Sequence, residues 1–504
     1  MSSSSGPVVL VALVLVVGVL AQGCAFPAPA STVVPAVATN SEPTAVPTTA
    51  AAEASQRGAS LEGHWEGAVD AAGQTIVTRV DFTTDGGALA GTVDFPQQLA
   101  LGLPLAKIEH EAGKVHFEAL PQPRTAIFDG ELEDNGKITG TFRQAGFEGT
   151  FHLERVQTQP AEKVPYHEEE VTFKNADVTL AGTLTLPESA SPYPAVVLIS
   201  GSGPQNRDEE LFGFKIFRVI ADHLTRRGIA VLRYDDRGVG GSSAGTSQDT
   251  TETFAGDVLA GVNYLKGRSE IDPKRIGLLG HSEGGIIAPL VATQSPDVAF
   301  VILMSGPGLT GRQIIMEQQK LILKADGSSD AVIAQKSALQ NRVIEAALTG
   351  KGWDEVKAEL RKEFKAAAES APASQREAMG DVDKWVETMV KSQTGAMQGA
   401  WMKFFLTYDP APTLEQVRVP VLALFGGKDL QVPAEVNRDA ILKALERGGN
   451  HDFASRLFPE ANHLYQNAQT GSPSEYATLK PEFTPGFLDA ISEWVLAHPG
   501  SSGK

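Results

Sequence analysis

The stretch Gly280-His281-Ser282-Glu283-Gly284 decides the fold of this 504-residue chain. It is a G-x-S-x-G pentapeptide that follows the apolar run Ile276-Gly277-Leu278-Leu279 and precedes the helix-like run Ile286-Ile287-Ala288-Pro289-Leu290-Val291. In such a strand–turn–helix setting the serine sits on a sharp turn with its hydroxyl exposed above a sheet, and the glycines let strand and helix approach closely. A chain with 50 glycines can match the pentapeptide by chance, so the flanking strand and helix carry the interpretation.

Around this pentapeptide, apolar runs alternate with helical patterns. This alternation predicts an α/β fold with a mostly parallel, doubly wound sheet that carries helices on both faces. A leading hairpin is expected at 171–173 and 179–186. Further strands are expected at 195–200, 229–233, 275–279, 298–304, 419–425 and 452–457, and helices at 212–227, 251–265, 434–447 and 487–497.

The alternation stops between residues 312 and 412. That stretch consists almost entirely of good helix formers, as in Asp354-Glu355-Val356-Lys357-Ala358-Glu359-Leu360. Because it separates two strands of the same sheet, we expect a helical cap inserted between a first part of the α/β domain, residues 166–311, and a second part, residues 413–498.

Residues 61–157 show a different pattern, with apolar and polar residues alternating in short runs between turn signals. This pattern predicts a small antiparallel barrel or sandwich. His64, His110, His116 and His152 are scattered along these runs, so we interpret them as surface or half-buried residues rather than metal ligands.

Residues 1–24 are typical of an export signal, because an apolar run over Val8–Leu20 is too short to span a membrane comfortably. The lone Cys24 follows a small residue, which resembles a bacterial lipoprotein cleavage site and predicts lipidation of Cys24. Simple cleavage near Ala30 and a retained anchor are the alternatives. Residues 25–60 are rich in Ala, Pro, Ser and Thr and predict a disordered linker.

Composition excludes several classes of function. The 43 Lys and Arg residues against 61 Asp and Glu residues give a net charge of −18, which disfavours nucleic acid and anionic membrane surfaces as partners. We therefore expect membrane contact only through the lipid anchor. A single cysteine excludes an intrachain disulfide and a cysteine-based zinc site.

A serine hydroxyl is a weak nucleophile at neutral pH, so Ser282 needs a base and the base needs an orienting acid. The acid candidate is Asp429, which follows the strand at 419–425 through a Gly-Gly turn; Asp409 and Glu435 compete with it. The base candidate is His463, which follows the strand at 452–457. The chain order serine, acid, histidine fits residues placed at the carboxyl ends of parallel strands.

Acyl transfer also needs hydrogen-bond donors for the developing oxyanion. One expected donor is the backbone N–H of Glu283, at the start of the helix after the serine. The other is the backbone N–H of Ser202, in the glycine-rich loop Ser200-Gly201-Ser202-Gly203-Pro204.

From about residue 171 to 497 the chain resembles the α/β-hydrolase superfamily, and within it the bacterial serine esterase branch related to serine aminopeptidases and acyl-CoA thioesterases. By this resemblance Ser282, Asp429 and His463 occupy the nucleophile, acid and base positions. The chain departs from many relatives by having Ser200-Gly201 where they carry His-Gly. The stretches that carry the resemblance are the pentapeptide, Gly201–Asp208, Tyr234–Ser242, Tyr408–Pro410 and Gly427–Pro433.

The sequence thus predicts an exported serine esterase that cleaves small-molecule carboxylic esters through an acyl-enzyme, with no metal or cofactor. A serine peptidase of the aminopeptidase or prolyl-oligopeptidase type is the nearest alternative. An acyl thioesterase fits less well, because coenzyme A thioesters are intracellular. An envelope lipoprotein that binds a partner through its β-rich unit is the non-enzymatic alternative.

Overall fold

The computed structural model describes residues 60–498, except 72–73, 86–87, 96–99, 120–124, 134, 145–146, 157–163, 372–375, 377–378 and 380. The predicted signal segment 1–24 with Cys24, and residues 25–59 of the predicted linker, lie outside the described residues. Within the part of the chain that is described, no helix is both long and apolar enough to cross a bilayer. The chain divides into two compact units; of the described residues, the first contains 60–156 and the second contains 164–371 and 381–498.

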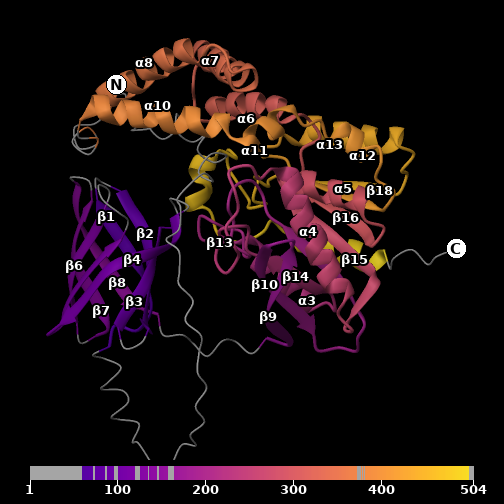
Figure 1. Cartoon of the computed structure of the whole chain (residues 1–504), viewed down its shortest axis with the longest axis horizontal. Coiled ribbons are helices and arrows are strands. Elements are labelled where there is room, and N and C mark those ends of the chain that lie inside the picture. The colour runs from indigo at the N-terminus through magenta and orange to yellow at the C-terminus, as the bar shows by residue number, and fades with distance from the viewer. Residues whose placement is uncertain are drawn as a thin grey trace, which may run out of the picture. The chain divides into compact units, whose positions relative to one another are not determined.

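The first unit is a closed antiparallel barrel in which β1 to β8 pair in chain order and β8 pairs back to β1 (Figure 1, indigo). The structure thereby decides between the barrel and the sandwich that the sequence left open. Alternate side chains point inward, as along β5, and close the interior. The strands are β1 Gly63–Ala71, β2 Gln74–Asp85, β3 Ala88–Phe95, β4 Ala100–Glu111, β5 Lys114–Ala119, β6 Ala126–Leu132, β7 Lys137–Gln144 and β8 Phe147–Arg155.

Aromatic side chains fill the barrel. Phe117 and Phe128 stack at 4.4 Å between ring centroids, and Phe82 and Phe151 meet Phe117 edge-on. Each of these four rings is at most 2% exposed. The barrel is therefore a packed core, in which shape complementarity of large rings supplies the stability.

His64 and His116 lie on this barrel with the same surroundings. His64 Nδ1 lies 2.6 Å from an Asp81 oxygen, and His116 Nδ1 lies 2.6 Å from an Asp129 oxygen; each aspartate is the cross-strand neighbour. Both pairs are partly exposed. Among the residues that the structure describes, no group of His, Cys, Asp and Glu is arranged to hold a metal ion.

The second unit is built on a sheet with the strand order β18-β17-β16-β15-β11-β14-β10-β9. Strands β14, β11, β15, β16, β17 and β18 are parallel, and β10 runs antiparallel to both of its neighbours. The strands are β9 Tyr166–Asn175, β10 Val178–Pro187, β11 Tyr193–Ile199, β14 Ala230–Tyr234, β15 Ile271–His281, β16 Val298–Met304, β17 Val421–Gly426 and β18 Phe453–Phe458.

Helices cover both faces of this sheet. The apolar side chains of α3 (Ile216–Thr225) and α14 (Phe487–Ala497) pack in one core. Those of α4 (Thr251–Lys266), α5 (Gly284–Gln294) and α13 (Ala434–Arg447) pack in the other. Every residue of β11, β14 and β17 is buried, as expected for strands covered on both sides. The predicted mostly parallel, doubly wound fold is confirmed.

Several boundaries differ from the sequence prediction, and two of them lie next to the site. The helix predicted from Phe212 begins at Ile216, because Glu210–Leu211 (β12) and Phe214–Lys215 (β13) form a small hairpin whose turn, Phe212-Gly213, has positive φ at both residues. A helix cannot pass through such a turn. The strand before the serine is also longer than predicted and starts at Ile271.

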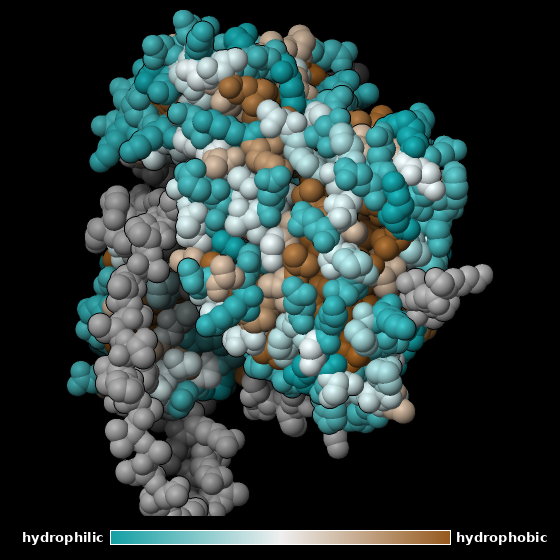
Figure 2. Space-filling view, turned by 45° about the vertical axis from the view of Figure 1, so that its right-hand side comes forward, coloured by the Kyte–Doolittle hydropathy of each residue, from teal (hydrophilic) through white to brown (hydrophobic). Residues whose placement is uncertain are grey.

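The predicted cap is a set of helices between β16 and β17, which lies over one end of the sheet (Figure 1, orange). Its helices pack on one another through buried apolar faces that join the α4–α5 core. Figure 2 shows apolar side chains interspersed with hydrophilic ones on the face in view. The helices are α6 Gly311–Ala325, α7 Asp330–Thr349, α8 Trp353–Ser370, α10 Val382–Gln398, α11 Ala400–Thr407 and α12 Ala411–Leu414.

Truncation of the central ring should destabilise the barrel. We expect Phe128→Ala, which removes a ring with 0% exposure and contacts to several neighbouring rings, to lower the free energy of unfolding of the barrel unit by about 3–5 kcal/mol. The matched control is Val77→Ala on β2, whose side chain is 39% exposed and should change it by less than about 0.5 kcal/mol. Chemical denaturation of the two variants measures the difference; equal effects would contradict a packed interior.

Candidate active site

Ser282 stands at the carboxyl end of β15 in a left-handed backbone conformation with φ +51°. Its amide donates to Met304 O at 2.9 Å, which holds the turn against β16. A Cβ on Gly280 would lie 1.9 Å from Gly284 O, and one on Gly284 would lie 2.3 Å from Ile199 O. The turn therefore requires glycines, and it holds a non-glycine residue in a strained conformation of the kind that clusters at functional sites.

Asp429 and His463 come together at the ends of β17 and β18. His463 Nδ1 lies 2.8 Å from Asp429 Oδ2, and both side chains are buried. The other carboxylate oxygen of Asp429 accepts the backbone N–H groups of Gln431 and Val432 at 2.9 and 2.8 Å. A carboxylate held this way accepts a hydrogen bond from the Nδ1–H group of the ring and leaves Nε2 as an acceptor.

The turns after β17 and β18, which carry this pair, lie in close backbone contact. A Cβ on Gly426 would lie 2.5 Å from Ala461 O, and the Gly427 N–H donates to Phe458 O at 2.8 Å. Asn462 has no exposed surface and its side-chain oxygen accepts the N–H groups of Leu464 and Gln466. The adjacency of β17 and β18 thus fixes the position of His463 relative to Asp429.

The structure brings the predicted acid and base into direct contact. The ring of His281, the neighbour of Ser282, contacts the backbone oxygen of His463 at 3.1 Å. Among the described residues, no hydrogen bond joins the Ser282 hydroxyl to the His463 ring. Such contacts often form only with substrate bound. The competing acid candidate Asp409 accepts the Ala411 N–H at the start of α12, which is a capping role.

The loop after β11 lies against the serine turn, because β11 and β15 are neighbours in the sheet. A Cβ on Gly201 would lie 3.3 Å from the Cβ of Ser282. The Gly201 N–H donates to Glu209 Oε1 at 2.7 Å, so this amide is already occupied. Ser202 and Glu283, the predicted oxyanion donors, are thus on adjacent segments, and their roles stay predictions.

Sequence reasoning missed a second histidine–carboxylate pair beside the site. His281 Nδ1 lies 2.8 Å from Glu209 Oε1, and both residues have at most 1% exposure. One Glu209 oxygen therefore joins the loop at Gly201 to the ring that supports the backbone of His463. The signal available in the sequence was the run Arg207-Asp208-Glu209-Glu210 directly after a glycine-rich loop.

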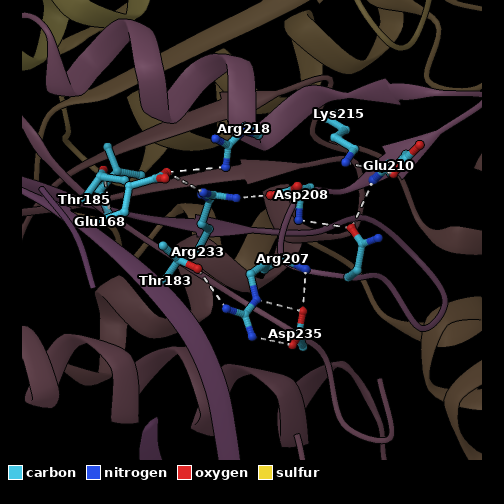
Figure 3. Close-up of polar contacts among 12 residues, drawn as sticks. Glu168, Thr183, Thr185, Arg207, Asp208, Glu210, Lys215, Arg218, Arg233 and Asp235 are labelled. Carbon is cyan, nitrogen blue, oxygen red and sulfur yellow. Dashed lines mark hydrogen bonds and ion pairs between the residues drawn. The ribbon is translucent and has the colours of Figure 1, made fainter. Parts of the chain in front are cut away.

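Two arginines fix the segment that carries Glu209 (Figure 3). Arg207 pairs through two nitrogens with Asp235, at 3.1 and 2.8 Å, at the end of β14. Arg233, only 2% exposed, pairs with Asp208 and, at 3.3 Å, with Glu168 on β9. These pairs tie residues 207–208, directly before Glu209, to the ends of β14 and β9.

The pair with Glu209 favours the charged form of His281. Burial alone would lower the pKa of His281, but the charge of Glu209 and the hydrogen bonds to Glu209 and the His463 carbonyl raise the pKa above its usual 6.5. A ring that contacts a carboxylate at Nδ1 and a carbonyl at Nε2 donates to both only when both nitrogens are protonated.

The chain is similar to known hydrolases. The model of a family described as serine aminopeptidase, S33, matches residues 214–467, about half of the chain, a range that contains Ser282, Asp429 and His463. The esterase EstD of Thermotoga maritima is 28% identical over 391 residues, which cover 75% of this chain and 82% of that protein. An esterase of Pyrococcus furiosus matches in structure with a TM-score of 0.42 and 15% identity, covering 68% of this chain and 96% of that one. A proline iminopeptidase of Mycobacterium smegmatis matches with a TM-score of 0.40 and 18% identity, covering 66% and 98%.

The buried His281–Glu209 pair should make stability depend on pH. Because the folded state raises the pKa of His281, its stabilisation is fully present below pH 6.5 and is lost as pH rises through the folded-state pKa. We expect His281→Gln to lower the free energy of unfolding by about 1–3 kcal/mol at about pH 6, with the difference shrinking towards about pH 9. The control is His451→Gln, at an exposed histidine, which should show no such trend. A difference that grew with pH would refute a charged His281.

Proposed function

The chain belongs to the serine aminopeptidase S33 family of α/β-hydrolases, and from this premise we propose that it is a serine hydrolase that cleaves carboxylic esters of small molecules. The observation that carries the proposal is the buried 2.8 Å contact between His463 and Asp429, together with a serine in a left-handed turn. The similarity to the Thermotoga maritima esterase, over 82% of that protein, supports an ester as substrate.

In the proposed reaction the Ser282 oxygen attacks the ester carbonyl carbon while His463 Nε2 takes the serine proton. Asp429 keeps the imidazole in the tautomer with a proton on Nδ1 and stabilises the imidazolium that forms. The backbone N–H groups of Glu283 and Ser202 bind the oxyanion, with the N-terminus of α5 adding its dipole. His463 then gives its proton to the departing alcohol, and a water molecule, activated by the same ring, hydrolyses the acyl-enzyme.

An aminopeptidase is the second candidate, favoured by the description of the matching family. Such an enzyme must bind the substrate's α-ammonium with a carboxylate. Three described carboxylates border the oxyanion loop, and each already accepts protein donors: Asp236 from Ser200 and Gln205, Glu209 from Gly201 and His281, and Glu283 from Thr251 and Trp401. The unpartnered oxygen, Glu209 Oε2, belongs to a residue with no exposed surface. These contacts favour the esterase.

Export remains part of the proposal. It rests on the apolar run of residues 8–20 and on Cys24, which would attach the protein to a membrane by lipidation. An extracytoplasmic enzyme does not meet coenzyme A thioesters, so export also argues against a thioesterase. A binding scaffold without activity would not need an acid and a base buried in contact.

Ester hydrolysis should depend on Ser282. We expect turnover of p-nitrophenyl acetate and butyrate, little turnover of aminoacyl p-nitroanilides, and a loss of at least about 10³-fold in kcat/KM for Ser282→Ala. An exposed serine in a turn outside the site, Ser247→Ala, serves as the matched control and should keep wild-type rates. Anilide turnover without ester turnover would favour the peptidase, and ester turnover that survives Ser282→Ala would end the proposal.

The acid should act through the tautomer of His463. In Asp429→Asn the amide can donate to Nδ1, which moves the ring proton to Nε2, so we expect kcat to fall by about 10⁴-fold while KM changes little. Stopped-flow or steady-state assays at several pH values measure the loss. Asp409→Asn, at the competing acid candidate, is the control; a larger loss in Asp409→Asn would reassign the acid.

A further inference from the structure

The pair of Glu209 and His281 has no step in the proposed reaction, yet it connects three segments that the reaction uses. Glu209 Oε1 accepts the Gly201 N–H of the oxyanion loop, residues 200–204, at 2.7 Å and lies 2.8 Å from His281 Nδ1. His281 Nε2 lies 3.1 Å from the backbone oxygen of His463. These contacts form one continuous chain from the loop after β11, through the residue before the nucleophile, to the loop that carries the base.

The strand order makes the contact between His281 and His463 more than a local one. The strand β15, which leads to Ser282, and the strand β18, which leads to His463, are not neighbours, because β16 and β17 lie between them. No backbone pairing of the sheet therefore joins the nucleophile turn to the base loop. The hydrogen bond of the His281 ring connects the two directly, and the centroids of the His281 and His463 rings lie 4.8 Å apart.

The oxyanion loop is held by the same carboxylate. Gly201 stands one residue before Ser202, whose backbone N–H is the expected oxyanion donor. A Cβ on Gly201 would lie 3.1 Å from Glu209 Oε1 and 3.3 Å from the Cβ of Ser282, so the loop, the carboxylate and the nucleophile turn are in close contact. Because glycine gives the loop little stiffness of its own, the hydrogen bond from the Gly201 N–H to Glu209 restricts where the next peptide can point.

The surroundings of Glu209 are unfavourable for a residue that serves only stability. Glu209 has no exposed surface, and its backbone is left-handed with φ +43°. Among the described residues, its second oxygen, Oε2, has no hydrogen-bond partner. An apolar pair in place of Glu209 and His281 would fill the space without burying charge or an unpaired oxygen. Strained, buried polar residues of this kind cluster at functional sites, which argues for a role in the reaction.

We propose that Glu209 and His281 act together as positioning residues for the reaction. Their contacts fix the oxyanion loop and the backbone of the base relative to the turn that carries Ser282. The inference rests on the proposed function, and it assigns neither residue a proton transfer or a contact with the substrate. Because the oxyanion and the imidazolium form only in the transition state, loss of these contacts should lower kcat more than it raises KM.

The first test removes both hydrogen bonds of the His281 ring. We expect His281→Phe, which keeps a ring without nitrogen atoms, to lower kcat for p-nitrophenyl acetate by about 10- to 100-fold with KM within about threefold, because small displacements of catalytic groups slow reactions this much. His223→Phe is the matched control: His223 lies on α3 and contacts Ser492 of α14 at 3.2 Å, outside the site. Its kcat should stay close to that of the wild type. Equal kcat values for the two variants would overturn the proposal.

Two partial substitutions separate hydrogen bonding from ring packing. The amide nitrogen of His281→Asn lies as many bonds from Cβ as Nδ1 does, so it can still donate to Glu209. The amide nitrogen of His281→Gln lies as many bonds away as Nε2 does, so it can still donate to the His463 carbonyl. Each variant should retain more kcat than His281→Phe, with kcat expressed per reactive serine and folding followed by thermal unfolding. If neither did, ring packing would be what matters, and the proposal would fail.

A double-mutant cycle tests whether the two residues act as one unit. Glu209→Gln keeps an oxygen that can accept the Gly201 N–H, but that single oxygen cannot also bond the Nδ1 of a neutral His281 ring. Its loss of kcat should therefore come from the contact with the ring. Glu209→Gln combined with His281→Phe should then lose no more kcat than the larger single variant loses. Losses that multiply would mean that the two residues act independently, which contradicts the proposal.

A serine-directed fluorophosphonate distinguishes failure of this inference from failure of the proposed function. The Ser282 oxygen forms a bond to phosphorus, its proton passes to His463 and fluoride leaves, so the labelling rate reports on the nucleophile, the base and the oxyanion hole without any ester substrate. Slower labelling of His281→Phe than of His223→Phe supports the positioning role. Equal labelling of the two, with the wild type reactive, refutes the positioning role alone. A wild type that neither labels nor hydrolyses esters refutes the proposed function and this inference with it.

Discussion

The left-handed turn at Ser282 is the constraint on which the site depends. A residue with a Cβ is strained in that backbone conformation. The turn persists because the glycines at 280 and 284 let the backbones of β15, α5 and the end of β11 come into contact. The Ser282 N–H bond to Met304 holds the turn to the next strand. Any larger residue at those glycines would push the helix off the sheet and carry the nucleophile with it.

Around this turn, three buried carboxylates have three different electrostatic environments. Asp429 faces a histidine ring and two backbone N–H groups, Glu209 faces a second histidine, and Glu283 has uncharged donors. Burial among neutral donors raises the pKa of Glu283, whereas the charge of Glu209 raises the pKa of its partner His281. The carboxylate of Asp429 contacts the proposed base, that of Glu209 accepts a hydrogen bond from the loop after β11, and that of Glu283 accepts one from cap helix α11.

The two compact units solve the problem of a stable core in different ways. The barrel closes its sheet and fills it with stacked aromatic rings, so it leaves no open strand edge. The α/β unit buries its parallel strands between two helical layers and keeps its polar residues at the carboxyl ends of the strands. The site residues described here all belong to the second unit.

The local sequence pattern was sufficient to predict the bounds of some helices and strands. The strand Val298–Met304 and the helices Ala434–Arg447 and Phe487–Ala497 have the predicted bounds, because continuous apolar runs and 3.6-residue periodicity depend on neighbours in the chain. The start of the helix at Ile216 was missed, because a positive φ at Phe212 is imposed by the hairpin rather than by residue type.

By itself the sequence determined the fold class, the serine turn and the identity of the residues proposed as acid and base, since glycine-rich turns after buried strands leave a clear signature. Only the tertiary structure decided what surrounds them. The contacts of Glu209 with His281, of Arg233 with Asp208 and of Trp401 with Glu283 join residues 25 to 118 positions apart. Such pairings depend on which strands become neighbours and on where the cap helices pack. The periodicity of the sequence does not indicate either of these.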